Sequence, residues 1–169
     1  AQNDGSLVQR MVLNSDRKQL LAKACIPYFK EHAFVFIDSG STNLAIASMI
    51  PHDLTLTVVT HTPAIAIALQ SHQQCDVILL GGKISKQQGA AIGSCSLKQL
   101  QTMHFDLAVL GSCAIDVEVG VSAFDVEDAQ FKHAIVKQSN NVLIAVTEEK
   151  LSSVARHKVT ALDAISVLI

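Results

Sequence analysis

Short apolar runs that alternate with helical patterns restrict the fold of this chain more than any other feature. The first run, residues 33–37, contains no polar residue and ends at Asp38. A strand without polar alternation is typical of a sheet that is covered on both faces. Further strands are predicted at residues 54–60, 75–80, 105–111, 141–146 and 164–169. Because helical patterns separate these runs, we predict right-handed βαβ units, and so an α/β fold with a mostly parallel sheet flanked by helices.

The segments between the strands carry the apolar spacing of short helices. Helices are predicted at residues 16–30, 43–50, 64–71, 94–104 and 125–139. The last of these begins with Asp125, and Asp128 follows three residues later, which is an aspartate version of a capping box.

Three stretches lack a clear pattern. Residues 1–15 look like a loose lead-in, residues 83–93 like a loop or short strand, and residues 112–124 like a polar, irregular segment. The sequence contains no internal repeat and no interior linker. We therefore expect a lead-in followed by one α/β domain over residues 16–169.

Composition excludes several classes of protein. The chain has 169 residues, of which 49% are hydrophobic, enough for one domain with a substantial core. No apolar stretch approaches the roughly 18 residues that a membrane span needs, so no membrane partner is expected. The net charge is −2 and the basic residues are scattered, so this chain alone is not expected to bind nucleic acid.

The cysteines and glycines argue against a metal or a cofactor. Cys25, Cys75, Cys95 and Cys113 lie far apart and form no C-x-x-C pair. A zinc site or a disulfide framework is therefore not expected, and a reducing cytoplasm suits the chain. The G-x-G-x-x-G and G-x-x-x-x-G-K-[ST] patterns are also missing, which disfavours a dinucleotide or a nucleoside triphosphate.

The segment Ser39-Gly40-Ser41-Thr42 lies between the first apolar strand and a predicted helix. A small, hydroxylated loop that enters a helix leaves backbone N–H groups free to point outward, and the helix dipole favours an anion there. The ligand expected at such a loop is a phosphate or a carboxylate. The alternative is a helix cap formed by Ser41 or Thr42 with no ligand.

Small or polar residues follow each of the first four predicted strands. They are Asp38 to Thr42, Thr60 to Thr62, Gly81 with Gly82, and Gly111 to Cys113 with Asp116 a little further on. Ligands of open α/β sheets bind outside the carboxyl ends of the strands, so these clusters predict one site for a small phosphorylated molecule. Each cluster alone has a structural explanation, as a cap or a turn.

An ordered series of short motifs gives the chain a resemblance to a known family. The motifs are residues 38–42 (DSGST), 58–62 (VVTHT), 78–82 (ILLGG), 111–116 (GSCAID), 125–132 (DVEDAQFK) and 149–151 (EKL), with Gly120. Together they resemble the carboxy-terminal sensor domain of the DeoR family of bacterial transcription regulators, over residues 10–169. The resemblance implies a fold shared with ribose-5-phosphate isomerase A and the coenzyme A transferases. It also implies a phosphorylated sugar or similar metabolite as effector, a homo-oligomer, and operator DNA bound only through an N-terminal winged helix-turn-helix domain absent from this chain.

The resemblance assigns ligand-binding roles to particular residues. The family's phosphate loop matches residues 38–42, its Thr-Asn-Ser pattern matches residues 60–62, and its acidic-to-lysine helix motif matches residues 125–132. The expected ligand-binding residues are Asp38, Ser39, Gly40, Ser41, Thr42, Thr60, His61, Thr62, Gly81, Gly82, Gly111, Asp116, Glu127 and Lys132. Lys132 is expected to neutralise an anionic ligand, with an i,i+4 ion pair to Asp128 as the alternative.

The chain departs from the family pattern at three places. His61 replaces an Asn, and Cys113-Ala114 stand in a segment where the family has a carboxylate. Residues 147–151 read Thr-Glu-Glu-Lys-Leu where the family has Asp-Ser-Ser-Lys-Phe.

Three functions remain open from the sequence. The first is a non-enzymatic sensor. Its ligand would shift the population of two domain or oligomer arrangements and so change the DNA affinity of an attached domain. The second is a sugar-phosphate isomerase on the same scaffold, with Asp116 or Glu127 as the base. The third is an oligomerisation module with a vestigial pocket.

Overall fold

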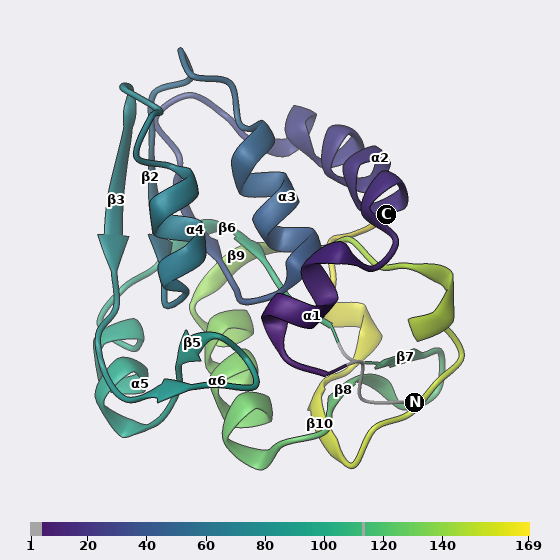
Figure 1. Cartoon of the computed structure of the whole chain (residues 1–169). Coiled ribbons are helices and arrows are strands. Elements are labelled where there is room, and N and C mark those ends of the chain that lie inside the picture. Colours follow the sequence, from purple (N-terminus) through teal and green to yellow (C-terminus); the bar gives the residue numbers. More distant parts are fainter. Residues whose placement is uncertain (1–4, 113) are drawn as a thin grey trace.

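A six-stranded parallel sheet forms the centre of the computed structural model, which describes residues 5–112 and 114–169 (Figure 1). The strands lie in the order β11-β9-β6-β1-β2-β3, and every neighbouring pair is parallel. They are β1 (Phe34–Ile37), β2 (Leu56–Thr60), β3 (Cys75–Leu79), β6 (Phe105–Val109), β9 (Ser139–Ile144) and β11 (Val167–Leu168). The predicted parallel α/β fold is thereby confirmed.

The strand order reverses between β1 and β6. The chain winds from β1 through β2 to β3 in one direction, then returns to β6 and continues through β9 to β11 in the other. The connections on either side of this pair therefore diverge. A ligand crevice is expected outside the carboxyl ends of strands at such a switch point.

Helices cover both faces of the sheet. They are α2 (Ser15–Cys25), α3 (Ser41–Met49), α4 (Pro63–Ala68), α5 (Ser94–Leu100) and α6 (Val126–Lys137). Apolar residues of α2, α3 and α4 form one core cluster, and those of α5 and α6 form another. Alternate β1 side chains enter the two clusters, Val35 and Ile37 on one face and Phe36 on the other, which explains the unbroken apolar run.

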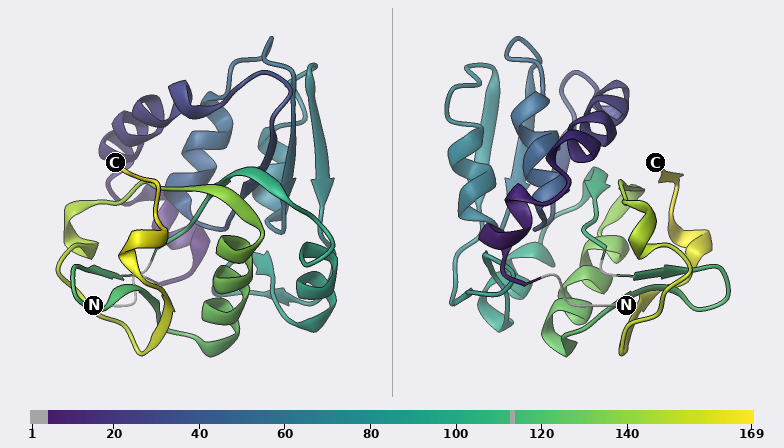
Figure 2. Two further views of the ribbon diagram at one scale, coloured as in Figure 1. Left: turned by 180° about the vertical axis from the view of Figure 1, so that it is seen from behind. Right: turned by 45° about the vertical axis from the view of Figure 1, so that its right-hand side comes forward.

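Two smaller sheets lie at the carboxyl end of the large one. The strands β7 (Ala114–Asp116), β8 (Gly120–Ala123) and β10 (His157–Thr160) form an antiparallel sheet in the order β10-β8-β7. The strands β4 (Ile84–Ser85) and β5 (Ala90–Ala91) form a short hairpin. Figure 2 shows the three-stranded sheet on the side of α6, away from the helices α2 to α4. The prediction of an irregular segment at residues 112–124 was wrong, because small buried residues pair there as a hairpin.

The lead-in is also ordered. Residues Leu7–Val12 form α1, and a capping box between Ser6 and Gln9 starts it. Leu7 is buried, and its N–H donates to Gln87 O in the β4–β5 loop at 3.2 Å. The prediction of a loose segment was therefore wrong for residues 7–12.

Several helices are shorter than predicted. Helix α2 ends at Cys25 and continues as η1 (Ile26–Tyr28), because Pro27 has no N–H to donate. Two further 3₁₀ turns, η2 (Glu148–Lys150) and η3 (Leu162–Ala164), lie in the C-terminal segment. None of the helices in the described part of the chain has the length and apolar character to cross a membrane.

Candidate functional site at the strand switch point

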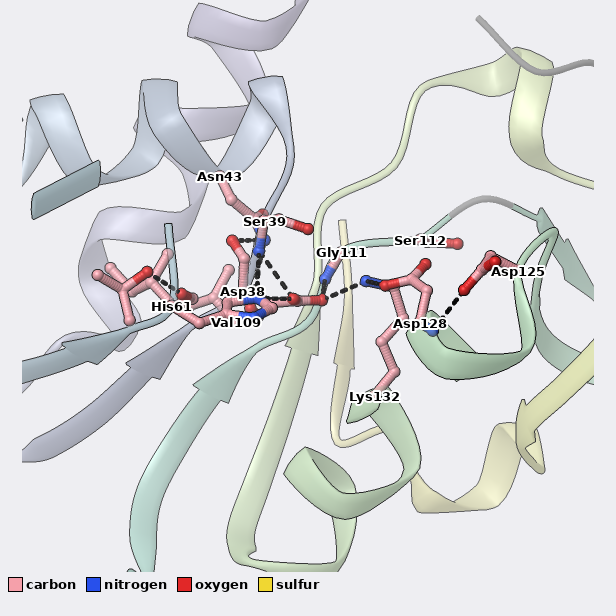
Figure 3. A network of polar contacts seen from close by, with 12 residues as sticks. Asp38, Ser39, Asn43, His61, Val109, Gly111, Ser112, Asp125, Asp128 and Lys132 are labelled. Carbon is pink, nitrogen blue, oxygen red and sulfur yellow. Dashed lines mark hydrogen bonds and ion pairs between the residues drawn. The ribbon is translucent and has the colours of Figure 1, made fainter. Parts of the chain in front are cut away.

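The Asp38 carboxylate lies at the centre of a buried polar network beside the switch point (Figure 3). Asp38 follows β1, and Gly111 follows β6. The carboxylate accepts hydrogen bonds from Ser39 N at 2.7 Å, His61 Nε2 at 2.8 Å, Gly111 N at 2.8 Å and Lys132 Nζ at 2.7 Å. Four donors leave little capacity on this carboxylate for a ligand.

Lys132 joins two buried carboxylates. Its Nζ lies 2.7 Å from Asp38 Oδ2 and 3.0 Å from Asp128 Oδ1, the second as an i,i+4 pair on α6. Burial raises the pKa of the Asp38 carboxyl, but Lys132 and His61 together outweigh burial and hold that pKa well below its usual range. Burial raises the pKa of Asp128, and Lys132 offsets this effect only in part. The ion pair to Asp128 was one of the two predictions for Lys132.

His61 faces an acceptor on each side of its ring. Its Nδ1 lies 2.8 Å from Ala91 O and its Nε2 lies 2.8 Å from Asp38 Oδ1. A carbonyl and an ionised carboxylate both accept hydrogen bonds, so these two contacts favour a proton on each ring nitrogen; the N–H of Ser39 also points at Nε2, from 3.4 Å. The ring stacks on Phe131 with centroids 4.3 Å apart and an interplanar angle of 2°, which suits a cation over an aromatic face.

Other polar residues of the network connect the strand ends by hydrogen bonds. Thr60 Oγ1 donates to Ile37 O at 2.7 Å, and Thr62 N donates to Thr60 Oγ1 at 3.2 Å. Asn43 Nδ2 donates to Asp38 O at 3.0 Å and to Val109 O at 3.3 Å. These bonds fix the ends of β1, β2 and β6 relative to one another.

The first turn of α3 offers donors at this edge. The backbone N–H groups of Ser41, Thr42 and Asn43 find no acceptor among the described residues, as expected for the first turn of a helix. The three residues are at least nine-tenths buried. Buried, open N–H groups at the start of a helix attract an anion or a water molecule.

An inner cavity of about 20 Å³ lies against this turn. Its lining residues are Arg10, Ser39, Gly40, Ser41, Thr42, Asn43, Gln88, Gly111, Ser112, Lys132, Ala145 and Lys150. A space of this size holds about one water molecule. Six predicted ligand-binding residues therefore gather around a space smaller than a phosphate.

An outer cavity of about 380 Å³ adjoins it and shares Arg10, Ser41 and Lys150 with the inner one. The remaining lining residues are Leu13, Asn14, Lys18, Thr147 and Glu149. This volume falls in the range of small-molecule sites. This cavity lies between the α1–α2 corner, the start of α3 and the η2 turn.

The other predicted residues lie elsewhere. Gly81 exchanges hydrogen bonds of 3.2 Å with the Gln99 amide of α5, and Gly82 packs beside Cys95 and Ser96. Asp116 accepts the N–H groups of Glu118 and Val119 in the β7–β8 turn. Glu127 is exposed on the first turn of α6, whose N-cap is Asp125, as predicted. Thr60, His61 and Thr62 are fully buried and line neither cavity. Cys113 lies outside the described residues.

Sequence reasoning missed Arg10, Lys18, Asn43 and Lys150. Asn43 follows directly on the predicted loop, and Lys150 lies in a family motif, so both carried a signal. Arg10 and Lys18 flank a segment with no pattern, and only the folded structure brings them to residues 41 and 150.

A larger groove, of about 690 Å³, lies between α5, α6 and β10. It contains none of the predicted site residues. Its walls come from the outer side of α6, away from the switch point. Among the residues that the structure describes, no cluster of three or more His, Cys, Asp or Glu side chains offers a metal site.

Comparisons with known proteins show the family and the fold of the chain. The family model described as "DeoR C terminal sensor domain" matches residues 13–169. The chain therefore belongs to the DeoR family of transcription regulators, as a sensor domain, as the sequence motifs predicted.

Named relatives include the HTH-type transcriptional regulator GlpR of Haloferax volcanii, 29% identical over 95% of this chain and 63% of the relative. Another is the glycerol-3-phosphate regulon repressor of Escherichia coli K12, 26% identical over 83% of this chain and 56% of the relative. The chain thus spans about three-fifths of the length of these relatives. Ribose 5-phosphate isomerase A from Methanocaldococcus jannaschii has a similar fold, with a TM-score of 0.58 at 14% identity over 82% of this chain and 55% of that protein. The predicted likeness to that isomerase is confirmed for the fold.

Proposed function

We propose that this chain is the effector-sensing part of a repressor of a sugar or sugar-alcohol phosphate operon, and that it binds a small phosphorylated metabolite without transforming it. One observation supports this proposal above all others. Unpaired N–H groups at the start of α3 and cationic side chains lie around two cavities that share three lining residues beside the strand switch point. Donors and positive charge in that arrangement favour a phosphate.

Effector binding would act by changing the relative populations of two arrangements of the protein. A ligand changes the DNA affinity of an attached domain only if it binds two arrangements of the protein with different affinity. Helix α1 is a candidate for the part that responds, because Arg10 lines both cavities while Asn14, in a left-handed conformation, separates α1 from α2. Relatives named as repressors support the role in transcription, which would take place in the cytoplasm.

An isomerase is the weaker alternative. Its candidate bases, Asp116 and Glu127, line neither of the two cavities. Asp128 is a buried carboxylate with a raised pKa, but its Oδ1 pairs with Lys132 behind the inner cavity. The likeness to ribose 5-phosphate isomerase A supports only a shared fold.

A thermal-shift and calorimetry screen tests the proposal. Sugar phosphates, glycerol 3-phosphate and their unphosphorylated counterparts are added at millimolar concentration, and turnover is followed in parallel. We expect at least one phosphorylated compound to stabilise the chain, by about 2.7 kcal/mol at a hundredfold excess over its Kd, with no turnover. The vestigial-pocket alternative predicts no stabilisation by any compound, and the isomerase alternative predicts turnover.

A further inference from the structure

The groove between α5, α6 and β10 combines apolar and cationic lining residues. Leu97 of α5 and Ala134 of α6 belong to its apolar part. Lys137, Arg156 and Lys158 also line it, and all three are exposed. None of the described residues that line the groove is acidic. The groove therefore matches a partner that presents an apolar side chain next to a carboxylate.

The three cations of the groove are not neutralised within the chain. Among the described residues, no carboxylate forms an ion pair with Lys137, Arg156 or Lys158, and no acceptor takes a hydrogen bond from their side chains. The chain as a whole carries a net charge of −2, so the charge of this groove is opposite in sign to that of the chain. Carboxylates elsewhere on a second copy can therefore supply the opposite charge.

The turn between β7 and β8 presents the complementary surface. Val117 in this turn is 83% exposed, and the adjacent Glu118 is exposed as well. The β10 residues of the groove lie beside Ser122 and Ala123, at the end of β8 that is distant from the turn. Figure 1 shows the turn on the far side of the three-stranded sheet from α5 and α6. The turn thus points away from the groove of its own chain.

Asp116 holds the turn in one conformation. Its Oδ1 accepts the N–H of Glu118 at 2.9 Å and the N–H of Val119 at 3.0 Å. Asp116 and Gly120 also pair directly across the hairpin. A turn that is ordered before binding loses little conformational entropy when it enters a groove, which favours association.

We infer that copies of this chain associate by inserting the β7–β8 turn of one copy into the groove between α5, α6 and β10 of another. Val117 contacts the apolar part of the groove, and Glu118 faces the cations Arg156 and Lys158. The contact joins two different surfaces, so the rotation between neighbouring copies determines whether the assembly closes as a reciprocal dimer, a larger ring or a filament. This inference goes beyond the proposed function and does not depend on the effector.

Sedimentation velocity of the whole chain, over a range of protein and salt concentrations, tests the interface. Val117→Ser should raise the Kd of association about tenfold, because a buried apolar side chain is lost. Glu118→Lys and Arg156→Glu should each raise it by about tenfold or more, because like charges then face each other. Added salt should weaken the association of the unchanged chain. The matched controls are Arg17→Glu and Asp53→Lys, which reverse exposed charges outside the turn and the groove.

A mixture of the two charge-reversed chains tests whether the turn and the groove face each other. When Glu118→Lys and Arg156→Glu chains are mixed, an altered turn can meet an altered groove, and an unaltered turn can meet an unaltered groove. Opposite charges then face each other in both contacts, so association should return to about the level of the unchanged chain. Thermal unfolding of each variant checks that it is folded.

Several results would overturn the inference. If the unchanged chain stays monomeric at millimolar concentration, no second copy occupies the groove, and an acidic segment of a different protein becomes the alternative occupant. If the chain associates and the turn and groove variants associate equally well, the interface lies elsewhere. If the mixture associates no better than either charge-reversed chain alone, the turn and the groove are not partners.

Discussion

The Asp38 network and the outer cavity lie next to each other but are built in opposite ways. In the network, the Asp38 carboxylate is saturated by four donors, and its charge is balanced by adjacent cations (Figure 3). The outer cavity has about 380 Å³ of space and three cationic side chains among its lining residues. The network is a set of groups that satisfy one another, and we call it the frame; the outer cavity is a space with cationic side chains in its wall. Of the predicted motif residues, Asp38, Thr60, His61, Thr62, Gly111 and Lys132 belong to the frame.

The largest effect is expected from removing the charge at the centre of the frame. Asp38→Asn leaves the buried cations Lys132 and His61 without their shared carboxylate. Breaking a buried ion pair costs about 3–5 kcal/mol, so urea denaturation should show a loss of this size. Asp53→Asn, at an exposed aspartate, is the control. A loss below about 1 kcal/mol would contradict the description of a charge-balanced frame.

Gly111 tests how closely the ends of β1 and β6 approach each other. A Cβ at this position would lie 2.3 Å from Ser39 O and 3.0 Å from Asp38 Oδ2. Gly111→Ala should therefore destabilise the chain by about 1–3 kcal/mol, measured by denaturant unfolding. Gly81→Ala is a matched control, because no atom lies within 4 Å of its added Cβ. Equal effects of the two substitutions would show that the approach of the strands is looser than described.

The protonation of His61 sharpens the electrostatic side of the comparison. Since both ring nitrogens face acceptors, ¹⁵N NMR at neutral pH should show two protonated nitrogens for His61. His61→Asn should cost about 1–3 kcal/mol, because one charge-assisted bond is lost in the buried network. His32, exposed and outside the network, serves as the spectroscopic reference. One unprotonated nitrogen in the His61 ring would refute the assignment of an imidazolium.

Lowering the pH should destabilise the Asp38 network. The pKa of Asp38 is lowered from its ordinary value of 3.8, so the native state binds this proton less tightly than the unfolded state does. The stability that Asp38 contributes is fully present above pH 3.8, the ordinary pKa of the group. This stability is lost as the pH falls through the lower pKa that Asp38 has in the folded state. The ¹³C carboxyl signal of Asp38 should therefore remain that of the ionised form at about pH 3. A midpoint at the ordinary value would contradict the lowered pKa.

The smallest effect is expected at the cap of α1, which borders the outer cavity. Ser6→Ala removes the capping box and should cost α1 about 1 kcal/mol. Hydrogen exchange in residues 7–12 should accelerate while β1 and β6 keep their protection. Addition of a bound phosphate compound should restore part of the protection, since Arg10 belongs to this helix. Unchanged exchange would mean that α1 does not depend on its cap.

The strands of the large sheet could be predicted from the sequence, whereas those of the three-stranded sheet could not. The strand β1 is buried on both faces and has an unbroken apolar sequence, so it could be predicted directly. The strands β3 and β6 each contain one exposed aspartate, Asp76 and Asp106, but their other residues are apolar enough to show a strand. The strand β8 consists of four buried residues, Gly120–Ala123, too small and too irregular in polarity to show a strand period. Helix α1 is short and depends on a tertiary contact through Leu7, which no local pattern reveals.

The position of the candidate site is easier to derive from the sequence than its lining. The rule that ligands bind at the carboxyl ends of parallel strands predicts a site at the edge where the inner cavity lies. The loop residues 39–42 do lie there, around the inner cavity. Arg10, Ser41 and Lys150, however, come together only through the fold, because they are distant in the chain. Conversely, Gly81, Gly82 and Asp116 have local structural roles that look the same in sequence as ligand-binding ones.

An NMR titration of the ¹⁵N-labelled chain with a phosphorylated ligand would show which residues the ligand contacts. We expect the largest shifts at Arg10, at the N–H groups of Ser41 to Asn43 and at Lys150, with the Asp38 and His61 signals nearly unchanged. Large shifts confined to Asp38, His61 and Lys132, or to the groove between α5, α6 and β10, would contradict it.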